Sequence, residues 1–275
     1  MARNLLAYQD LIRLAVFASV LSSMLAWEVL APRRPRAAGR LARWPGNFGV
    51  VVAGALLARL VFPVTAVVWA GLVEARGAGL FNLAGLPAWL ALPGAVIALD
   101  LAIWAQHVVF HRVPALWRLH RMHHADIDLD ATSGARFHPF EIVLSLGIKF
   151  AVIAALGAPA AAVLVFEVLL NACATFNHAN IALPERVDRA LRLVLVTPDM
   201  HRIHHSWRRA ETDSNFGFCL PWWDRLFGTY RVAPVDGQAG MTIGLPEFRD
   251  PGEARLDRLL TQPFRKGQDQ AVSAP

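Results

Sequence analysis

Apolar residues form long runs along the first part of the chain. Residues 11–30 are about 20 residues long, enough to cross a hydrocarbon core of about 30 Å as a helix. Residues 48–73 form a second run, with a bend expected at Pro63. A central arginine, Arg59, raises the free energy of membrane insertion by roughly 2.5–3.5 kcal/mol, whereas each Val, Leu or Phe lowers it by roughly 0.3–0.6 kcal/mol. We therefore expect this run to insert, with Arg59 facing protein. A third helix is expected to begin around Pro93 and to run through His111.

A fourth apolar stretch, residues 141–176, is interrupted at Gly157-Ala158-Pro159 and predicts a helical hairpin. Leucines near the C-terminus (Leu256, Leu259 and Leu260) predict a short amphipathic helix. We therefore expect an all-α integral membrane protein with four to five membrane helices and a cytosolic helical cap that carries the histidines. We divide the chain into N-terminal membrane helices (1–92), a histidine-bearing domain (93–230) and a polar C-terminal tail (231–275).

Composition supports the membrane location and excludes several classes of protein. Hydrophobic residues make up 55% of the chain and charged residues 17%, whereas soluble domains carry about 25% charged residues. The two cysteines cannot hold an iron–sulfur cluster, which needs four thiolates, and no glycine-rich nucleotide-binding motif occurs. The net charge of +6 comes mostly from arginines beside apolar runs, which indicates anionic lipid as a partner and no nucleic acid. The arginines of residues 33–43 predict a loop on the cytoplasmic side, in a bacterial inner membrane.

Histidine supplies the chemical signal. All ten histidines lie between residues 107 and 205, and the order His-Arg-apolar-His-His occurs at His120–His124 and again at His201–His205. Positions i, i+3 and i+4 fall within an arc of about 100° on a helix, so these side chains share a face. His107 and His111, at i and i+4, share a face as well. Imidazole is the commonest protein metal ligand, and ten are too many for one ion, so the pattern predicts a dinuclear metal site.

We predict that all ten histidines bind metal, with four or five at each ion. The predicted ligands are His107, His111, His120, His123, His124, His138, His178, His201, His204 and His205. His138 precedes Pro139 and has an alternative role as a hydrogen-bonding residue at the start of a helix. An all-nitrogen ligand set with open positions suits iron and O₂, and zinc can act as a substitute.

Polar residues near the histidines are candidates to accept the second ring N–H of a ligand and fix its tautomer. The first candidates are Asp100, Asp126, Asp199 and Asn177; for Asp100 an ion pair with Arg59 is the alternative. Further carboxylates, with arginines to neutralise them, lie close by in the sequence: Asp128, Asp130, Glu141, Asp213, Arg121, Arg136 and Arg202. Aromatic residues that could line an apolar tunnel beside the site are Trp104, Phe110, Phe137, Phe150 and Phe176.

Taken in order, these motifs resemble those of the fatty acid hydroxylase/sterol desaturase superfamily of integral membrane di-iron oxygenases, and of bacterial sterol desaturase-like members in particular. The resemblance covers roughly residues 98–230 and extends weakly to Phe264. Its motifs are HxxxH at His107–His111, HxxHH at His120–His124, RFHPFE at Arg136–Glu141, NHAN at Asn177–Asn180, HRIHH at His201–His205 and WDRLFGTY at Trp223–Tyr230. One departure is Val108, where many members have an arginine after the first histidine.

The resemblance implies that residues 93–230 are a catalytic domain whose histidines bind two non-haem irons. With O₂ as co-substrate, such a site attacks an unactivated C–H bond of a membrane lipid, which is a fatty acyl chain, a sterol or another isoprenoid. An external electron donor of the ferredoxin or cytochrome type, with its reductase, is implied because the cytochrome b5 motif HPGG is absent. Two other classes are kept as alternatives: a membrane electron carrier with histidine-ligated haem, and a transition-metal transporter.

Overall fold

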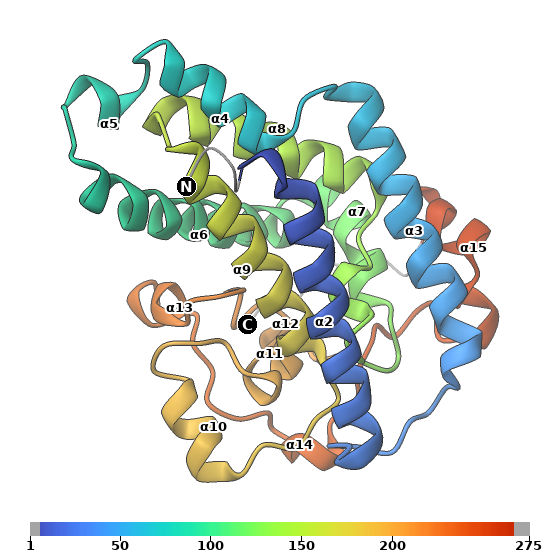
Figure 1. The fold of residues 1–275 in the computed structure, drawn as a ribbon. Helices are drawn as coiled ribbons and strands as arrows, with labels where there is room; N and C mark the ends of the chain where they lie inside the picture. The colour runs from blue at the N-terminus through green and yellow to red at the C-terminus, as the bar shows by residue number, and fades with distance from the viewer. Residues whose placement is uncertain (1–5, 267–275) are drawn as a thin grey trace.

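The computed structural model describes residues 6–266, and this part of the chain consists of helices, loops and two isolated β-bridges (Figure 1). Its long helices are α2 (Gln9–Leu30), α3 (Arg40–Val61), α6 (Ala88–Arg112), α8 (Pro139–Leu156) and α9 (Ala160–His178). The shorter helices are α4 (Ala66–Ala75), α5 (Leu80–Leu83), α7 (Pro114–His124), α10 (Glu185–Leu191), α11 (Pro198–His204), α12 (Arg209–Thr212), α13 (Trp222–Leu226), α14 (Gly237–Gly240) and α15 (Leu256–Thr261), with 3-10 turns at Ser133–Ala135, Pro251–Ala254 and Gln262–Phe264.

Five helical segments of this part of the chain are long and apolar enough to cross a membrane, as expected from the sequence. Two boundaries differ from the prediction. The second segment begins at Arg40, so Arg43 and Pro45 lie in α3 and not in a basic loop. The third helix begins at Ala88 with Pro87 as its N-cap, so Pro93 lies inside the helix and does not mark its start. The bend expected at Pro63 is the break between α3 and α4.

Helices α8 and α9 form the predicted hairpin. Gly157 ends α8 with φ of +68°, a left-handed conformation that glycine adopts without steric cost. A Cβ at Gly79 would lie 2.1 Å from the backbone nitrogen of Gly157, so the loop before α5 packs directly on the hairpin turn.

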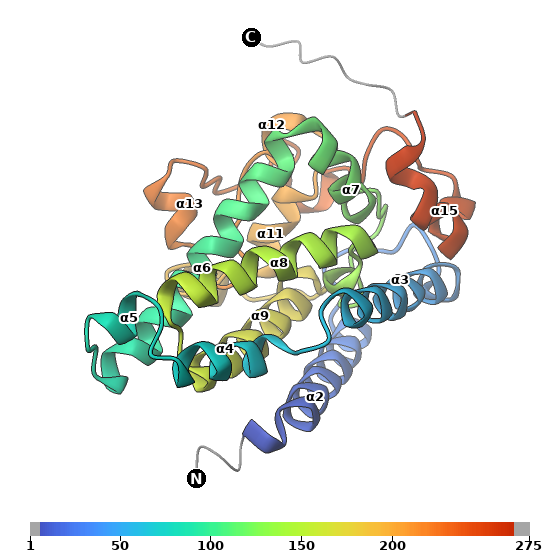
Figure 2. The same cartoon turned by 90° about the horizontal axis from the view of Figure 1, so that it is seen from above.

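Figure 2 shows α3 and α4 following one another along one side of α8, with α5 at the far end.

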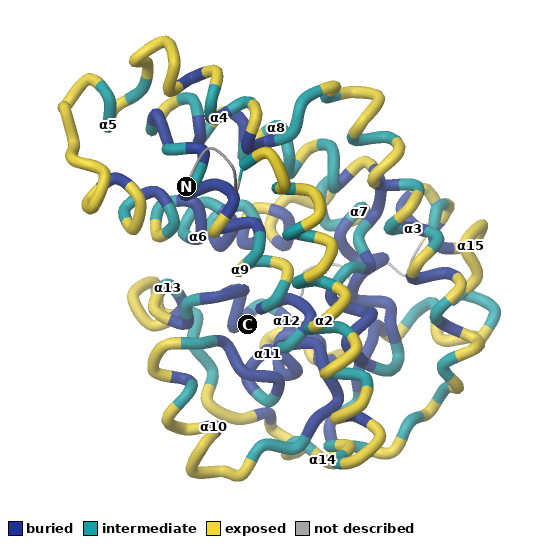
Figure 3. The backbone as a smooth tube through the Cα atoms, in the orientation of Figure 1, coloured by how far each residue is buried: buried dark blue, intermediate teal, exposed yellow. Residues whose placement is uncertain are grey.

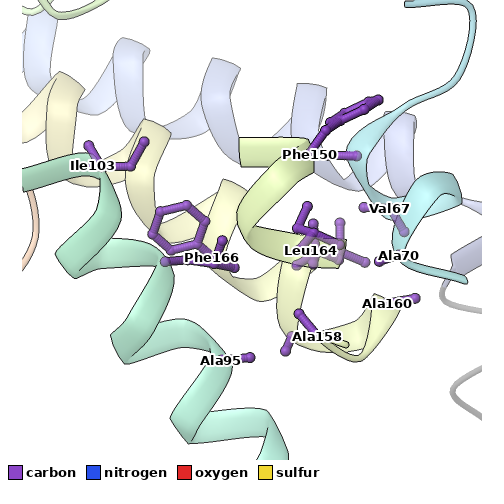
Figure 4. Close-up of a cluster of buried hydrophobic side chains, with 14 of the residues drawn as sticks. Val67, Ala70, Ala95, Ile103, Phe150, Ala158, Ala160, Leu164 and Phe166 are labelled. Carbon is purple, nitrogen blue, oxygen red and sulfur yellow. The ribbon is translucent and has the colours of Figure 1, made fainter. Parts of the chain in front are cut away.

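The largest hydrophobic cluster fills the space between α4, α6, α8 and α9 (Figure 4). Small residues such as Ala70, Ala95 and Ala158 let the helices approach closely, as is usual in membrane bundles. Trp69 stacks on Phe150 with ring centroids 5.7 Å apart and donates a hydrogen bond to the Phe150 carbonyl. This packing belongs to the membrane-spanning part, away from most of the histidines.

The opposite end of the bundle is a cap built from α7 and the segments after α9. In Figure 3 the buried backbone concentrates in this cap, around α7 and α11, whereas much of α2 is exposed. Arg43 of α3 joins the cap to the bundle through Asp126 and Asp130, with N···O distances of 2.7–2.8 Å. The C-terminal helix α15 forms as predicted and buries Leu259 against Val50 and Met122. Residues 267–275 of the predicted tail lie outside the described residues.

Candidate metal centre

Four helices deliver the histidines to one place. His107 and His111 lie one turn apart in the last turns of α6. Val113 is extended and Pro114 opens α7, so the chain turns sharply and returns the first His-Arg-apolar-His-His box toward α6. His178 is the last residue of α9. The second box lies on α11, which begins at Pro198 and is capped by the Thr197 hydroxyl accepting from the Met200 N–H.

Nine of the ten histidines converge into two adjacent groups whose ring nitrogens lie within 4.8 Å of one another in each group. The five-histidine group consists of His107, His111, His120, His124 and His204. The four-histidine group consists of His123, His178, His201 and His205. All nine side chains are buried. The rings of His124 and His205, one from each group, stack with centroids 4.5 Å apart, so the two groups form one continuous centre.

Each sequence box contributes to both groups. The histidines at i and i+4 of the first box, His120 and His124, belong to the five-histidine group, whereas His123 between them belongs to the four-histidine group. The second box divides in the opposite sense, because His201 and His205 belong to the four-histidine group and His204 to the five-histidine group. Helical geometry explains this division. Relative to residue i, the side chains at i+3 and i+4 are rotated to opposite sides of the helix face, so they can point to different groups.

Hydrogen bonds fix the tautomers in the four-histidine group. The Nδ1–H of His178 donates to the Ala174 carbonyl over 2.7 Å, and the Nδ1–H of His123 donates to the Arg136 carbonyl over 3.2 Å. A neutral ring has one proton, so both Nε2 atoms carry lone pairs, yet they lie 3.1 Å apart. The Nε2 of His178 also lies 3.2 Å from the Nε2 of His201 and of His205. One nitrogen cannot hydrogen-bond to three others, so a shared cation explains this convergence.

The same arrangement recurs in the five-histidine group. His107 donates its Nδ1–H to the Phe216 carbonyl, and His120 directs Nδ1 at the Glu141 carboxylate, both over 2.7 Å. Their Nε2 atoms then face each other at 3.0 Å. Two nitrogens that each lie about 2.0–2.1 Å from one metal ion are separated by about 3 Å. The Nε2 atoms of His111 and His204 are buried without a partner among the described residues. The donor set therefore fits a metal ion in each group.

Burial keeps these imidazoles neutral. Removal from water, together with neighbouring imidazoles, holds the pKa of His123, His124, His201 and His205 well below the usual value for histidine. Burial lowers the pKa of His204 to about 3. Metals bind the neutral ring, so the centre is ready to bind cations across the physiological pH range.

Within residues 6–266, two carboxylates contact the ligand rings, and both contacts are to members of the five-histidine group. Glu141 is the nearly buried partner of His120, and Asp213 lies 3.2 Å from Nδ1 of His111. Both were among the further carboxylates named from the sequence. A carboxylate that accepts the Nδ1–H raises the basicity of the ligand and fixes its orientation.

The four candidates named first do not contact a histidine ring nitrogen. Asp100 accepts from the indole N–H of Trp223 over 2.8 Å, so neither the imidazole contact nor the pair with Arg59 is correct. Asn177 donates to the Phe218 carbonyl. Asp199 pairs with Arg33 and Arg202.

Asp126 instead binds two buried arginines, Arg43 and Arg136. Burial alone would raise the pKa of the Asp126 carboxyl, but these two guanidinium groups hold it below its ordinary value. The carboxylate therefore stabilises the loop between α7 and α8, and through that loop the Arg136 carbonyl that orients His123.

His138 is the exception among the predicted ligands. It lies outside both groups and caps α8: its Nδ1 accepts from the Phe140 N–H, and its Nε2 donates to the Leu260 carbonyl, each over 3.2 Å. Both ring nitrogens are therefore occupied. The prediction that His138 binds metal is corrected to the alternative role, a hydrogen bond at the start of the helix.

A cavity of about 480 Å³ adjoins the centre. His107 and His120 of the five-histidine group line one end, and no member of the four-histidine group is among its lining residues. Of the aromatic residues proposed for a tunnel, Phe110 and Phe137 line the cavity, but Trp104, Phe150 and Phe176 do not. Phe137 also stacks on His123 with centroids 4.4 Å apart, which separates the four-histidine group from the cavity.

The sequence analysis missed a charged cluster in the membrane-spanning part. Glu167 of α9 pairs with Lys149 of α8 at 2.8 Å and lies 3.4 Å from Arg13 of α2. All three side chains, with Arg59, line the cavity. Arg59 is exposed rather than packed against protein, contrary to the expectation. The signal was available, because ionisable residues within apolar runs mark functional positions in membrane proteins.

Comparison with known proteins matches residues 92–229 to the family model described as fatty acid hydroxylase. Among curated proteins, an ornithine lipid hydroxylase of Rhizobium tropici is 30% identical over 65% of this chain and 52% of its own length. Human alkylglycerol monooxygenase is 29% identical over 66% of this chain and 39% of its own length. Rat cholesterol 25-hydroxylase is 26% identical over 70% of this chain and 63% of its own length.

These matches therefore cover about half the length of the relatives, with a range of 39–63% in the three named here. No solved structure matches the chain significantly.

Proposed function

The chain belongs to the fatty acid hydroxylase family, and from that premise we propose that it is a membrane oxidoreductase that oxidises an unactivated C–H bond of a lipid. One observation carries the proposal: nine buried histidines form two adjacent metal-binding groups at the end of an apolar cavity between membrane helices. A soluble substrate would not require that placement, whereas a lipid chain can enter the cavity from the bilayer.

The two histidine groups would each hold one iron, and the bound iron pair would supply the activation of O₂. The residues of the chain would orient the ligands and position the substrate. Carbonyl and carboxylate partners hold the ring protons at Nδ1 and leave Nε2 free for metal, as described for His107, His120, His123 and His178. The apolar wall of the cavity excludes water and positions one C–H bond of the substrate beside His107 and His120.

We propose hydroxylation rather than desaturation as the reaction. The three relatives are named for hydroxylation or monooxygenation, and their names give three different lipids: an ornithine lipid, an alkylglycerol and cholesterol. Lipid as a class is therefore the inference we carry over to this chain. Electrons would come from an external ferredoxin or cytochrome with its reductase, and zinc can replace iron without supporting turnover because it has no redox chemistry.

Isotope labelling tests the reaction directly. Membranes that contain the protein are incubated with ¹⁸O₂ and an electron donor, and the extracted lipids are analysed by mass spectrometry. A lipid that gains one labelled oxygen only when the protein is present supports hydroxylation, and an unlabelled new double bond supports desaturation. Unchanged lipids on deletion and on overexpression with donor supplied would reject the lipid-oxygenase proposal. A metal assay and a visible spectrum of the purified protein separate non-haem iron from haem or transported metal.

We also propose that the histidine end faces the cytoplasm in a bacterial inner membrane. Five arginines lie at this end, in the loop between α2 and α3 and in the first turn of α3: Arg33, Arg34, Arg36, Arg40 and Arg43. Positive residues favour the cytoplasmic side. Single cysteines at Gly39 and Arg76 test the orientation with a membrane-impermeant maleimide on intact cells, since Cys173 and Cys219 are buried. Labelling at Arg76 alone is expected, and labelling at Gly39 alone would reverse the topology.

A further inference from the structure

The cavity joins the metal centre to a cluster of charged side chains, and most of its lining lies on α3, α6, α8 and α9. On α8 the lining residues Glu141, Ser145 and Lys149 are four residues apart, so they form one stripe. Glu141 holds His120 at one end of the stripe, and Lys149 lies eight residues further along. At 1.5 Å per residue, the two ends are separated by about 12 Å along the helix. The cavity therefore has a histidine end and a charged end.

The charged end carries more cations than anions. It contains Arg13, Arg59 and Lys149 against one carboxylate, Glu167. Glu167 pairs with both Lys149 and Arg13. Arg13 also lies 3.9 Å from Asp10, whose side chain is 78% exposed. Arg59 makes no hydrogen bond or ion pair within residues 6–266. An unpaired cation within a membrane-spanning segment is costly, so this end of the cavity favours an anion.

The walls between the two ends are apolar. Val51 and Ala55 of α3, Ile142 and Leu146 of α8 and Leu170 of α9 face the space between them. The charged end also adjoins the loop between α3 and α4, whose course Figure 2 shows. Phe62, Val64 and Thr65 of this loop line the cavity, and the Thr65 hydroxyl donates to the Gln9 side chain of α2.

We propose that the cavity binds an amphipath with an anionic group, a carboxylate or a phosphate, with Arg59 as its main partner at the charged end. Arg13 and Lys149 add to the positive potential there. The alkyl chain of the amphipath runs along the apolar stripe toward His107 and His120. The charged end thus selects the substrate and sets which carbon reaches the histidine end. This inference rests on the proposed function and adds a substrate class to it.

Photo-cross-linking tests the binding mode without turnover. The purified protein in nanodiscs, with no electron donor, is irradiated with palmitic acid that carries a diazirine near its methyl end. The matched probe is the corresponding alcohol, which lacks the charge. We expect the acid to cross-link at the histidine end, on residues such as Phe137, Phe218 and Ala174, and the alcohol to cross-link much less. A charge-assisted hydrogen bond corresponds to roughly a tenfold difference or more in affinity.

Variants of Arg59 identify the anchor. Arg59→Gln is expected to reduce cross-linking of the acid roughly tenfold, and Arg59→Lys to retain most of it, because a cation is preserved. Since Arg59 makes no hydrogen bond or ion pair within the described residues, its replacement removes no such contact from the fold. The matched control is Arg76→Gln, which changes an exposed arginine at the end of α4 that does not line the cavity. Its cross-linking is expected to equal that of the parent.

Three results would overturn the inference: equal cross-linking of acid and alcohol, no effect of Arg59→Gln, or cross-links at Phe62 and Val64 rather than at the histidine end. Absence of any cross-link inside the cavity would overturn it as well. Failure of the proposed function would look different: the cross-links would form as expected, but the ¹⁸O₂ experiment would yield no oxidised lipid. If oxidised lipid forms while cross-linking ignores the charge, only the anionic substrate is rejected.

Discussion

The five-histidine group and the four-histidine group are built from the same two sequence boxes, yet they have different surroundings. The five-histidine group contacts two carboxylates, Glu141 and Asp213, and its members His107 and His120 line the cavity. In the four-histidine group, the Nδ1 partners of His123 and His178 are backbone carbonyls, and among the described residues no carboxylate hydrogen-bonds to a ring of this group. None of its histidines lines the cavity, from which the Phe137 ring separates His123.

This difference indicates that the two groups have different roles in the centre. Backbone carbonyls also orient His107 and His204 of the five-histidine group. The four-histidine group therefore differs in having no carboxylate partner among the described residues and in the Phe137 ring that stacks on His123 between the group and the cavity. Carboxylates add negative charge next to a ligand ring and make it a stronger donor. The five-histidine group therefore combines carboxylate-supported ligands with a position on the cavity wall, whereas the four-histidine group lies behind Phe137. The following variants test that comparison, from the largest expected effect to the smallest.

Removal of one ligand from either group is expected to have the largest effect. His124→Ala and His205→Ala change the equivalent histidine of each box, and their rings stack across the two groups. Each variant is expected to lose at least half of the bound metal and all lipid oxidation, because the proposed O₂ chemistry would need both ions. Metal content is measured by mass spectrometry on purified protein beside the ¹⁸O₂ assay. Full activity in either variant would refute the dinuclear centre.

Glu141→Gln is expected to have the next largest effect, because it removes the negative charge beside His120 and keeps the shape of the side chain. Loss of such a partner typically weakens metal affinity roughly 10–100-fold. Competition with a chelator measures the change. Glu211→Gln is the matched control, since Glu211 is also buried but accepts from the Val235 N–H and contacts no ligand ring. Equal metal affinity in the two variants would remove the distinction between the groups.

Asp213→Asn tests the second carboxylate and is expected to weaken metal affinity only a few-fold. The Asp213 side chain is 36% exposed and is shared with Arg209, so water screens its interaction with His111. The same chelator titration applies. An effect as large as that of Glu141→Gln would mean that solvent exposure does not limit this contact.

His138→Ala is expected to leave the metal content unchanged. It removes the cap of α8 and is expected to lower the free energy of unfolding by about 1 kcal/mol, the usual magnitude for an N-cap. Thermal unfolding in detergent and the metal assay are measured on the same preparation. If metal were lost without any change in unfolding temperature, His138 would have to be returned to the ligand set.

The sequence by itself determined the membrane helices and the chemistry of the site. Long apolar runs predict helices because only helices satisfy every backbone hydrogen bond inside a bilayer, and the five segments form as this rule requires. Histidines at i, i+3 and i+4 predict shared faces because helical periodicity is local. The starts of α3 at Arg40 and of α6 at Ala88 were predicted incorrectly, because Pro93 was taken to mark the start of a helix and Pro45 to belong to a loop, whereas both lie inside helices.

Only the tertiary structure decided how those residues are used. The division of each box between two groups, the choice of Glu141 and Asp213 over Asp100 and Asp199, and the capping role of His138 all depend on which helices meet. Residues far apart in the sequence form these contacts, and no local pattern specifies them. The charged end of the cavity has the same origin: α2, α3, α8 and α9 each supply one charged side chain, and only their packing makes a binding site of them.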